Sequence, residues 1–210
     1  MKALIFDMDG VMIDSEIHWG IDERSFIKGL VTHWDSRDQA RITGMSPRGV
    51  YELLCQEYGL NLTWEEYKPR FDEVGALVYS KAQLLDGFLE FIKSVKIHYR
   101  TAVASSADKK NIKLILDRFN LHPLFNVVVS AEDIKGKSKP VPDIYLHTAK
   151  KLGVDPCDCV VIEDAQNGVL AAKAAGMICI GLRNGINHAQ DLSAADQIAE
   201  GFKNLKLRNL

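Results

Sequence analysis

Short apolar runs recur along the chain, and each is followed by a polar loop and then by a stretch whose apolar residues have helical spacing. Continuous apolar runs of this kind are typical of parallel strands that are covered on both faces. The repeated order of strand and helix predicts an α/β fold, a doubly wound, Rossmann-like parallel sheet with right-handed crossovers. The predicted strands are Lys2–Phe6, Thr101–Ala104, Asn126–Val129, Cys159–Ile162 and Met177–Leu182.

Apolar residues at helical spacing predict helices between these strands, over Asp108–Asn120 and Pro142–Leu152. Further helices are expected over about Phe88–Ser94 and Gly168–Ala175. The last residues, Leu205–Leu210, are expected to form a loose end, as chain termini often do.

The segment from about Ser15 to Gln83 breaks this alternation, because it contains helix-period stretches and no convincing strand. We therefore predict two domains: an α/β core of residues 1–14 and 83–210, and a helical cap of residues 15–82 inserted into it. Ligands of open α/β sheets bind beyond the carboxyl ends of the strands, so an insertion directly after the first strand would cover the site. Hinges are expected near Asp14-Ser15 and over Gln83–Gly87.

Composition and charge exclude several classes of partner. The 210 residues carry 26 basic and 28 acidic side chains, a net charge of −2, and no long block of like charges. This balance gives no electrostatic footprint for nucleic acid or for an anionic membrane surface. No window approaches 18 apolar residues, and Met1-Lys2 leads into a short strand and not into a signal-peptide pattern. We expect a cytoplasmic protein that is a monomer.

The first candidate for chemistry is Asp7-Met8-Asp9-Gly10, at the end of the first predicted strand. Two carboxylates that share one pocket are costly unless a cation neutralises them or one takes up a proton. A hard divalent cation resolves this repulsion, and all-oxygen ligands favour Mg²⁺. The alternative is an ordinary turn, because Asp and Gly are common turn residues.

A second acidic pair, Glu163-Asp164, follows the predicted strand Cys159–Ile162 in the same way. Two acidic pairs at neighbouring strand ends would form a cage for a metal ion. The alternative is that Asp164 only caps the helix that begins near Gly168.

Two further features could bind an anion. Ser105 and Ser106 follow the strand Thr101–Ala104 and precede a helix, so they offer hydroxyls and free backbone N–H groups. Lys139 is followed by Pro140 and Pro142, which stiffen the approach to the next helix and would hold the charge in place. The alternatives are a helix cap for the serines and a solvated side chain for the lysine.

The four features in this order resemble the haloacid dehalogenase-like phosphohydrolase superfamily: Asp-x-Asp-Gly-Val, a hydroxyl after the second core strand, an isolated Lys-Pro and an acidic pair with Asn-Gly. Asp7–Glu16, Lys139–Tyr145 and Val161–Met177 are similar to the branch that contains β-phosphoglucomutase and small sugar-phosphate phosphatases. The resemblance spans nearly the whole chain and is weakest in the predicted cap.

The resemblance implies a role for each matching residue. Asp7 matches the nucleophile that forms an aspartyl-phosphate, and Asp9 matches the general acid and base. Ser105, with its neighbour Ser106, and Lys139 match the phosphate-binding positions. The Mg²⁺ ligands implied are the Asp7 carboxylate, the Asp9 main-chain carbonyl and Asp164, with Glu163 acting directly or through water.

The cap departs from the pattern of the family's mutases, which place a histidine five residues after the linker aspartate and an arginine soon after a Gly-x-Ser. Five residues after Asp14 comes Trp19, with His18 one residue earlier, and Arg48 lies one residue late after Ser46. One residue rotates a helical side chain by about 100°, so neither His18 nor Arg48 is expected to replace its counterpart. Both remain candidate substrate contacts.

The expected function is therefore a Mg²⁺-dependent phosphatase that hydrolyses a small phosphorylated metabolite of the sugar-phosphate class through an aspartyl-phosphate. A β-phosphoglucomutase-like intramolecular phosphomutase is the alternative. A non-enzymatic phospho-acceptor or interaction module is a remote third reading, because a fold alone does not fix a function.

Overall fold

The computed structural model describes residues 1–135 and 137–207. A loose end was expected over Leu205–Leu210. Residues 208–210 of this segment lie outside the described residues. The expectation is wrong for Leu205, which is 8% exposed and belongs to the same apolar cluster as Phe202. None of the helices in the described ranges is long and apolar enough to cross a membrane.

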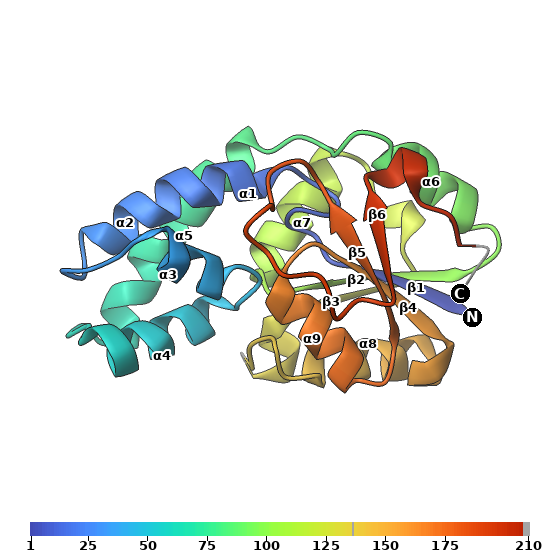
Figure 1. The fold of residues 1–210 in the computed structure, drawn as a ribbon. Helices are drawn as coiled ribbons and strands as arrows, with labels where there is room; N and C mark the ends of the chain where they lie inside the picture. The colour runs from blue at the N-terminus through green and yellow to red at the C-terminus, as the bar shows by residue number, and fades with distance from the viewer. Residues whose placement is uncertain (136, 208–210) are drawn as a thin grey trace.

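A six-stranded sheet with the order β3-β2-β1-β4-β5-β6 forms the core, and every neighbouring pair is parallel (Figure 1). The predicted α/β fold class is confirmed. The strands are β1 (Ala3–Phe6), β2 (Arg100–Ser105), β3 (Val127–Ser130), β4 (Cys159–Glu163), β5 (Ile178–Arg183) and β6 (Gln197–Glu200).

Strand β6, at the edge of the sheet, was not predicted from the sequence. Its pattern explains why, because only Ala199 is buried while Ile198 is 47% exposed. An edge strand with one buried residue gives no continuous apolar run, so the signal that identified the other strands is absent.

Side chains of the central strands enter two apolar clusters, one on each face of the sheet. On β1, Leu4 and Phe6 join the cluster that includes Phe88 and Ile112, whereas Ile5 joins the cluster on the opposite face. The sheet is therefore covered on both faces, as Figure 1 shows. The covering helices are α6 (Phe88–Val95), α7 (Lys109–Arg118), α8 (Asp143–Leu152) and α9 (Gln166–Ala174).

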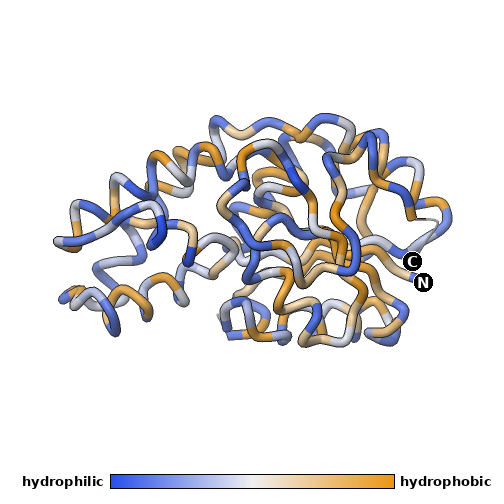
Figure 2. The backbone as a smooth tube through the Cα atoms, viewed as in Figure 1, coloured by the Kyte–Doolittle hydropathy of each residue, from blue (hydrophilic) through white to orange (hydrophobic). Residues whose placement is uncertain are grey.

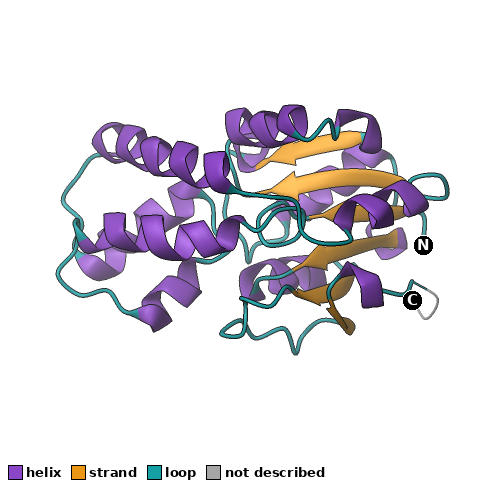
Figure 3. Ribbon diagram, turned by 90° about the horizontal axis from the view of Figure 1, so that it is seen from above, coloured by secondary structure: helices purple, strands orange, loops and turns teal. Residues whose placement is uncertain are grey.

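The helices between β1 and α6 form a separate lobe beside the sheet (Figures 1 and 3). They pack around an apolar cluster of their own, in which Leu54 and Tyr67 are fully buried. Its elements are α1 (Ser15–His18), a π-helical turn η1 (Trp19–Glu23), α2 (Arg24–Lys28), α3 (Ser36–Ile42), α4 (Pro47–Tyr58) and α5 (Trp64–Lys81). We call this lobe the cap; its behaviour as a separate domain with the predicted bounds stays a prediction.

Local sequence signals fix where the cap helices begin and end. Ser46 caps α4 through the N–H of Gly49, with Pro47 in the first turn, and Gly59 ends α4 with a φ of 67°. Thr63 and Glu66 form a capping box at the start of α5. The tube in Figure 2 shows the resulting amphipathic pattern, with hydrophilic and hydrophobic residues alternating along these helices.

The two chain segments that connect the cap to the core lie side by side. The backbone N–H of Asp14 donates to the carbonyl of Gln83 at 3.0 Å, and Ile13 and Leu84 form an antiparallel bridge. These are the segments in which hinges were predicted.

Candidate active site

The carboxyl ends of β1, β2 and β4 face the cap, as the arrowheads in Figure 3 show. Each of these ends carries polar residues of the predicted site: Asp7 after β1, Ser106 after β2, and Asp164 after β4. The site therefore lies at the edge of the sheet where ligands of open α/β folds bind.

Two glycines allow the acidic residues to come together. Gly10 has a φ of 71°, and a Cβ there would lie 2.0 Å from Oδ2 of Asp164. A Cβ on Gly168 would lie 1.8 Å from Oε1 of Glu163. Any side chain at either position would displace a carboxylate. Both positions therefore require glycine, because a carboxylate lies so close to the backbone there.

A buried ion-pair network connects three of the predicted residues. Nζ of Lys139 lies 2.6 Å from Oδ1 of Asp7 and 2.5 Å from Oε1 of Glu163, and all three side chains are at most 7% exposed. The hydroxyl of Tyr145 also donates to Oε1 of Glu163, at 2.5 Å. Burial lowers the pKa of Lys139, but the Asp7 and Glu163 carboxylates outweigh it and raise that pKa above its usual value.

Three buried carboxylates form a group with the spacing of a metal site. Ligand oxygens of Asp7, Glu163 and Asp164 all lie within 4.8 Å of one another. Oδ2 of Asp164 accepts a hydrogen bond from the side chain of Asn184 at 3.0 Å, and Asn184 also donates to the carbonyl of Gly10. Asn184 thus fixes the orientation of one carboxylate of the group.

The charge balance of this group favours a divalent cation. Burial is the main cause that raises the pKa of Asp7, to about 8, against the opposing effect of Lys139. Burial, together with the neighbouring Glu16 and Glu163, also raises the pKa of Asp164 well above its usual range. The single positive charge of Lys139 thus does not neutralise the three carboxylates. A hard cation that prefers oxygen ligands fits this set of donor atoms.

The Asp9 side chain points to the cap and not into the group of three carboxylates. Its Oδ1 accepts hydrogen bonds from Ser15 Oγ at 2.6 Å and Trp19 Nε1 at 3.2 Å, and its Oδ2 accepts from Tyr79 Oη at 3.1 Å. Burial raises the pKa of Asp9, while these three donors lower it.

The two serines after β2 have different surroundings. Ser105 is fully buried, and its Oγ accepts a hydrogen bond from the N–H of Ala107 at 3.1 Å. Ser106 lines the cavity between core and cap, and its Oγ donates to the carbonyl of Gly44 in the cap at 2.7 Å. Only Ser106 has its side chain at the cavity in this structure.

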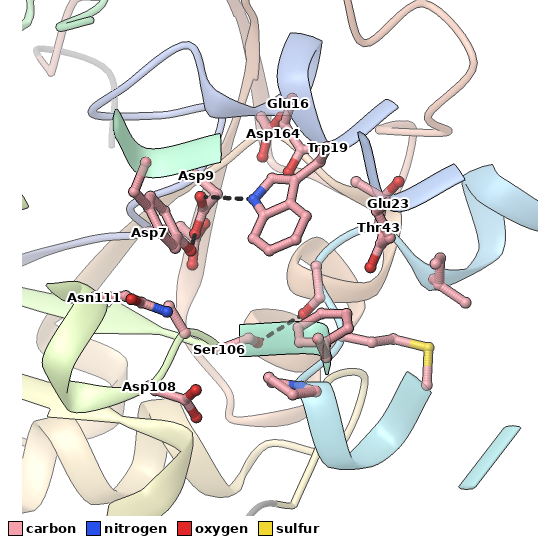
Figure 4. Close-up of a pocket in the computed structure, with 17 residues that line it drawn as sticks. Asp7, Asp9, Glu16, Trp19, Glu23, Thr43, Ser106, Asp108, Asn111 and Asp164 are labelled. Atoms are coloured by element: carbon pink, nitrogen blue, oxygen red, sulfur yellow. Dashed lines mark hydrogen bonds between the residues drawn. The ribbon is translucent and has the colours of Figure 1, made fainter. Parts of the chain in front are cut away.

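A cavity between core and cap contains the acidic site (Figure 4). Figure 4 shows Asp7 and Asp9 on one side of the cavity and Glu23 and Thr43 on the other, with the indole of Trp19 between them. Of the predicted residues, Asp7, Asp9, Ser106 and Asp164 line this cavity. Lys139 and Glu163 do not line the cavity. Lys139 forms ion pairs with both Asp7 and Glu163.

The two candidate substrate contacts, His18 and Arg48, do not line this cavity. His18 is half-buried on α1, outside the set of lining residues. Arg48 lines a second cavity of about 610 Å³, which lies between the cap and core residues such as Asp108 and Glu132. There Arg48 forms an ion pair with Glu52 at 2.8 Å. Its guanidinium lies over the rings of Trp64 and Tyr51, at 5.0 and 5.3 Å from their centroids.

Several residues of the site were not identified from the sequence. Tyr145 lies within a motif that the analysis quoted, and Asn184 directly follows the carboxyl end of β5, where the strand-end rule would have found it. The cap residues Glu16, Trp19 and Glu23 have the spacing i, i+3, i+7, which places them on one helical face.

Comparisons with known proteins agree with this geometry. The family model for haloacid dehalogenase-like hydrolases matches residues 1–176. The phosphorylated carbohydrates phosphatase of Thermotoga maritima is 32% identical over 204 residues, which cover 95% of the chain and 93% of that protein. A bifunctional riboflavin kinase/FMN phosphatase of Arabidopsis thaliana is 29% identical over 98% of the chain, which spans 55% of that longer protein. The crystal structure of β-phosphoglucomutase from Clostridium difficile has a TM-score of 0.80 and 25% identity, covering 99% of the chain and 94% of its own.

Proposed function

Because the chain belongs to the haloacid dehalogenase-like hydrolase family, we propose that it is a Mg²⁺-dependent phosphatase that hydrolyses a small monoester of the sugar-phosphate class. The observation that carries the proposal is the buried contact of Asp7 with Lys139, beside Glu163 and Asp164. The similarity to a phosphorylated carbohydrates phosphatase supports the substrate class. Cytoplasmic localisation and a monomeric state stay predictions.

In the first half-reaction, a carboxylate oxygen of Asp7 attacks phosphorus and the bond from phosphorus to the ester oxygen breaks. The electron pair of that bond goes to the leaving oxygen, which takes a proton from Asp9. The products are the free alcohol and an aspartyl-phosphate on Asp7. Lys139 contributes a positive charge next to the attacking carboxylate and the transferred group.

In the second half-reaction, water attacks the phosphorus of the aspartyl-phosphate and gives a proton to Asp9. The bond from phosphorus to the Asp7 oxygen breaks, so inorganic phosphate leaves and the Asp7 carboxylate is restored. Asp9 returns to its protonated form and the cycle balances.

The hydrogen bonds of Asp9 decide which of its oxygens carries the proton. An indole N–H can only donate, so Oδ1, which faces Trp19, must remain an acceptor. A hydroxyl can rotate and accept instead, so Oδ2, which faces Tyr79, is the oxygen that can hold a proton. We assign the transferred proton to Oδ2.

Asp7, Asp164 and Glu163 would hold Mg²⁺, with the Asp9 main-chain carbonyl as a further ligand implied by the family. When bound, the ion neutralises the charge between the Asp7 carboxylate and the phosphate, which repel by roughly 4 kcal/mol per charge pair at about 4 Å and a dielectric near 20.

A phosphomutase is the second candidate, supported by the similarity to a solved β-phosphoglucomutase. It would use the same nucleophile, with a second sugar hydroxyl in place of water as the phosphoryl acceptor. Phosphorus NMR of the product mixture separates the two, because a pure mutase releases no net inorganic phosphate.

Release of phosphate from a panel of phosphorylated metabolites, with Mg²⁺ and with EDTA, tests the proposal. We expect Mg²⁺-dependent release by the wild type and its loss in Asp7→Asn. Comparable release by Asp7→Asn would contradict it.

A further inference from the structure

Glu23 is a cap carboxyl that the mechanism above does not use. It ends the π-helical turn η1, is 7% exposed, and lines the cavity that contains Asp7. Its Oε2 accepts a hydrogen bond from Nε2 of Gln39 at 2.7 Å, and Oε1 of Gln39 accepts one from the indole of Trp34 at 2.9 Å. Because an indole N–H can only donate, Trp34 fixes the Gln39 amide with its NH₂ group towards Glu23.

The second oxygen of this carboxyl is left for a ligand. No group in the described ranges, residues 1–135 and 137–207, forms a hydrogen bond with Oε1 of Glu23. Because Glu23 lines the cavity, a ligand bound there can reach Oε1 and supply its hydrogen bond. Figure 4 shows Glu23 across the cavity from Asp7. An ester whose phosphorus lies at Asp7 can therefore extend its alcohol part towards Glu23.

The charge of this end of the cavity restricts what can bind there. Glu16 lies on the same helical face as Glu23 and also lines the cavity. Among the described residues that line it, none is a lysine, arginine or histidine. The nearby cation Lys139 is already paired with Asp7 and Glu163. A second anionic group on the substrate would therefore lose its hydration without meeting a compensating charge.

Hydrogen-bonding groups line the cavity on both sides. Thr43 lies beside Glu23, and Asn111 lies on the side of Asp7 (Figure 4). Their hydroxyl and amide groups suit a ligand that carries several hydroxyls, since each hydroxyl can both donate and accept.

We propose that Glu23 is a specificity-determining residue: it hydrogen-bonds a hydroxyl of a neutral, polyhydroxylated leaving group, and the cap wall, which offers no cation, disfavours substrates with a second phosphate or a carboxylate. The inference rests on the proposed phosphatase function and narrows its substrate class to monophosphates of neutral sugars or polyols.

The second cavity, between cap and core, is lined by four cations, and three of them are already paired. Arg48 is paired with Glu52, and Lys68 is paired with Asp72 and, at 2.8 Å, with Asp108. Lys137 is paired with Asp143, so among the described residues only Lys135 lines this cavity without an ion pair. Strong binding of a second phosphate there would have to break these pairs.

The test measures kcat/KM for three kinds of substrate on each preparation: a panel of hexose and hexitol monophosphates, butyl phosphate, which has no hydroxyl, and fructose 1,6-bisphosphate. The readout is the ratio of the best sugar monophosphate to butyl phosphate, which does not depend on the fraction of folded enzyme. We expect Glu23→Leu to lower this ratio at least tenfold by removing a hydrogen bond, and Glu23→Gln to retain part of it. Glu73→Gln makes the same substitution on the exposed side of α5 and is expected to keep the ratio.

Two results would overturn the inference while leaving the proposed function intact. One is an unchanged ratio in Glu23→Leu, and the other is hydrolysis of the bisphosphate as fast as of the best monophosphate, both with turnover that still requires Asp7. Turnover that does not require Asp7 would instead contradict the proposed function.

Discussion

The indole Nε1 of Trp19 donates a hydrogen bond to Oδ1 of Asp9 across 3.2 Å, which connects the cap directly to the proposed acid and base. The ring of Trp19 also stacks on Phe71 of α5, with the centroids 5.6 Å apart. Cap packing and the orientation of Asp9 therefore depend on the same side chain.

Trp19→Phe should keep the stacking and lose the hydrogen bond. We expect kcat to fall about tenfold, because a hydrogen bond to a charged group contributes about 1.5–3 kcal/mol and Ser15 and Tyr79 still hold Asp9. Steady-state kinetics measure the change. Trp64→Phe is the matched control, since Trp64 lines the second cavity and not the cavity that contains Asp9. An unaltered kcat in Trp19→Phe would show that the bond does not position Asp9.

Gly168→Ala should disturb the site by displacing the Glu163 carboxyl. The new Cβ would meet the Glu163 carboxyl, which in turn contacts Lys139. We expect kcat/KM to fall at least tenfold and the unfolding temperature to drop by several degrees. Gly20→Ala adds a methyl group where nothing lies within 4 Å and serves as the control. Wild-type activity and stability in Gly168→Ala would refute the close-approach argument.

Magnesium should stabilise the folded protein, because it binds a site that exists only in the native state. At 100 times the dissociation constant the gain is about 2.7 kcal/mol, which thermal unfolding detects without any activity assay. Asp164→Asn should lose most of this shift. Asp158→Asn, which changes a surface carboxylate paired with Lys2, should retain it. An equal shift in both variants would place the ion elsewhere.

Glu23 should make stability depend on pH. Burial is the main cause that raises the pKa of Glu23 in the folded protein, to about 8 from 4.5, while the bond from Gln39 opposes the rise. The protonated form therefore stabilises the fold below about pH 4.5, and this contribution is lost as the pH rises through about 8.

Glu23→Gln cannot ionise, so its stability relative to the wild type should increase from pH 5 to pH 9, by a few kcal/mol at most. Urea denaturation at a series of pH values measures the difference. A difference that is constant with pH would mean that Glu23 is ionised throughout this range.

The sequence predicted the sheet and the core residues of the site for a common physical reason. Strands buried on both faces are continuous apolar runs, and the residue after such a run lies at the sheet edge where ligands bind. Asp7 and Asp164 were predicted in this way, and the structure brings them together with Glu163, which pairs with Lys139. The roles of these residues stay predictions.

The cap could not be predicted to the same depth, because its apolar pattern indicates the wrong face. Ile17 and Ile21 are 43% and 64% exposed, whereas the polar residues Glu16 and Glu23 line the cavity. Hydrophobicity normally marks the buried face of a helix, and here the binding cavity reverses that rule. Arg48 was a candidate contact because of its position in the sequence. Its pairing with Glu52 in the second cavity follows from packing that one sequence does not reveal.

The central claim is that Asp7 carries the phosphoryl group during turnover. The most direct test is rapid acid quenching of the enzyme with Mg²⁺ and ³²P-labelled sugar monophosphate, followed by digestion and peptide mapping. We predict label on the peptide that contains Asp7, released by hydroxylamine as expected of an acyl phosphate, and no label in Asp7→Asn. Label on another residue, or turnover by Asp7→Asn at a rate comparable to the wild type, would contradict the account.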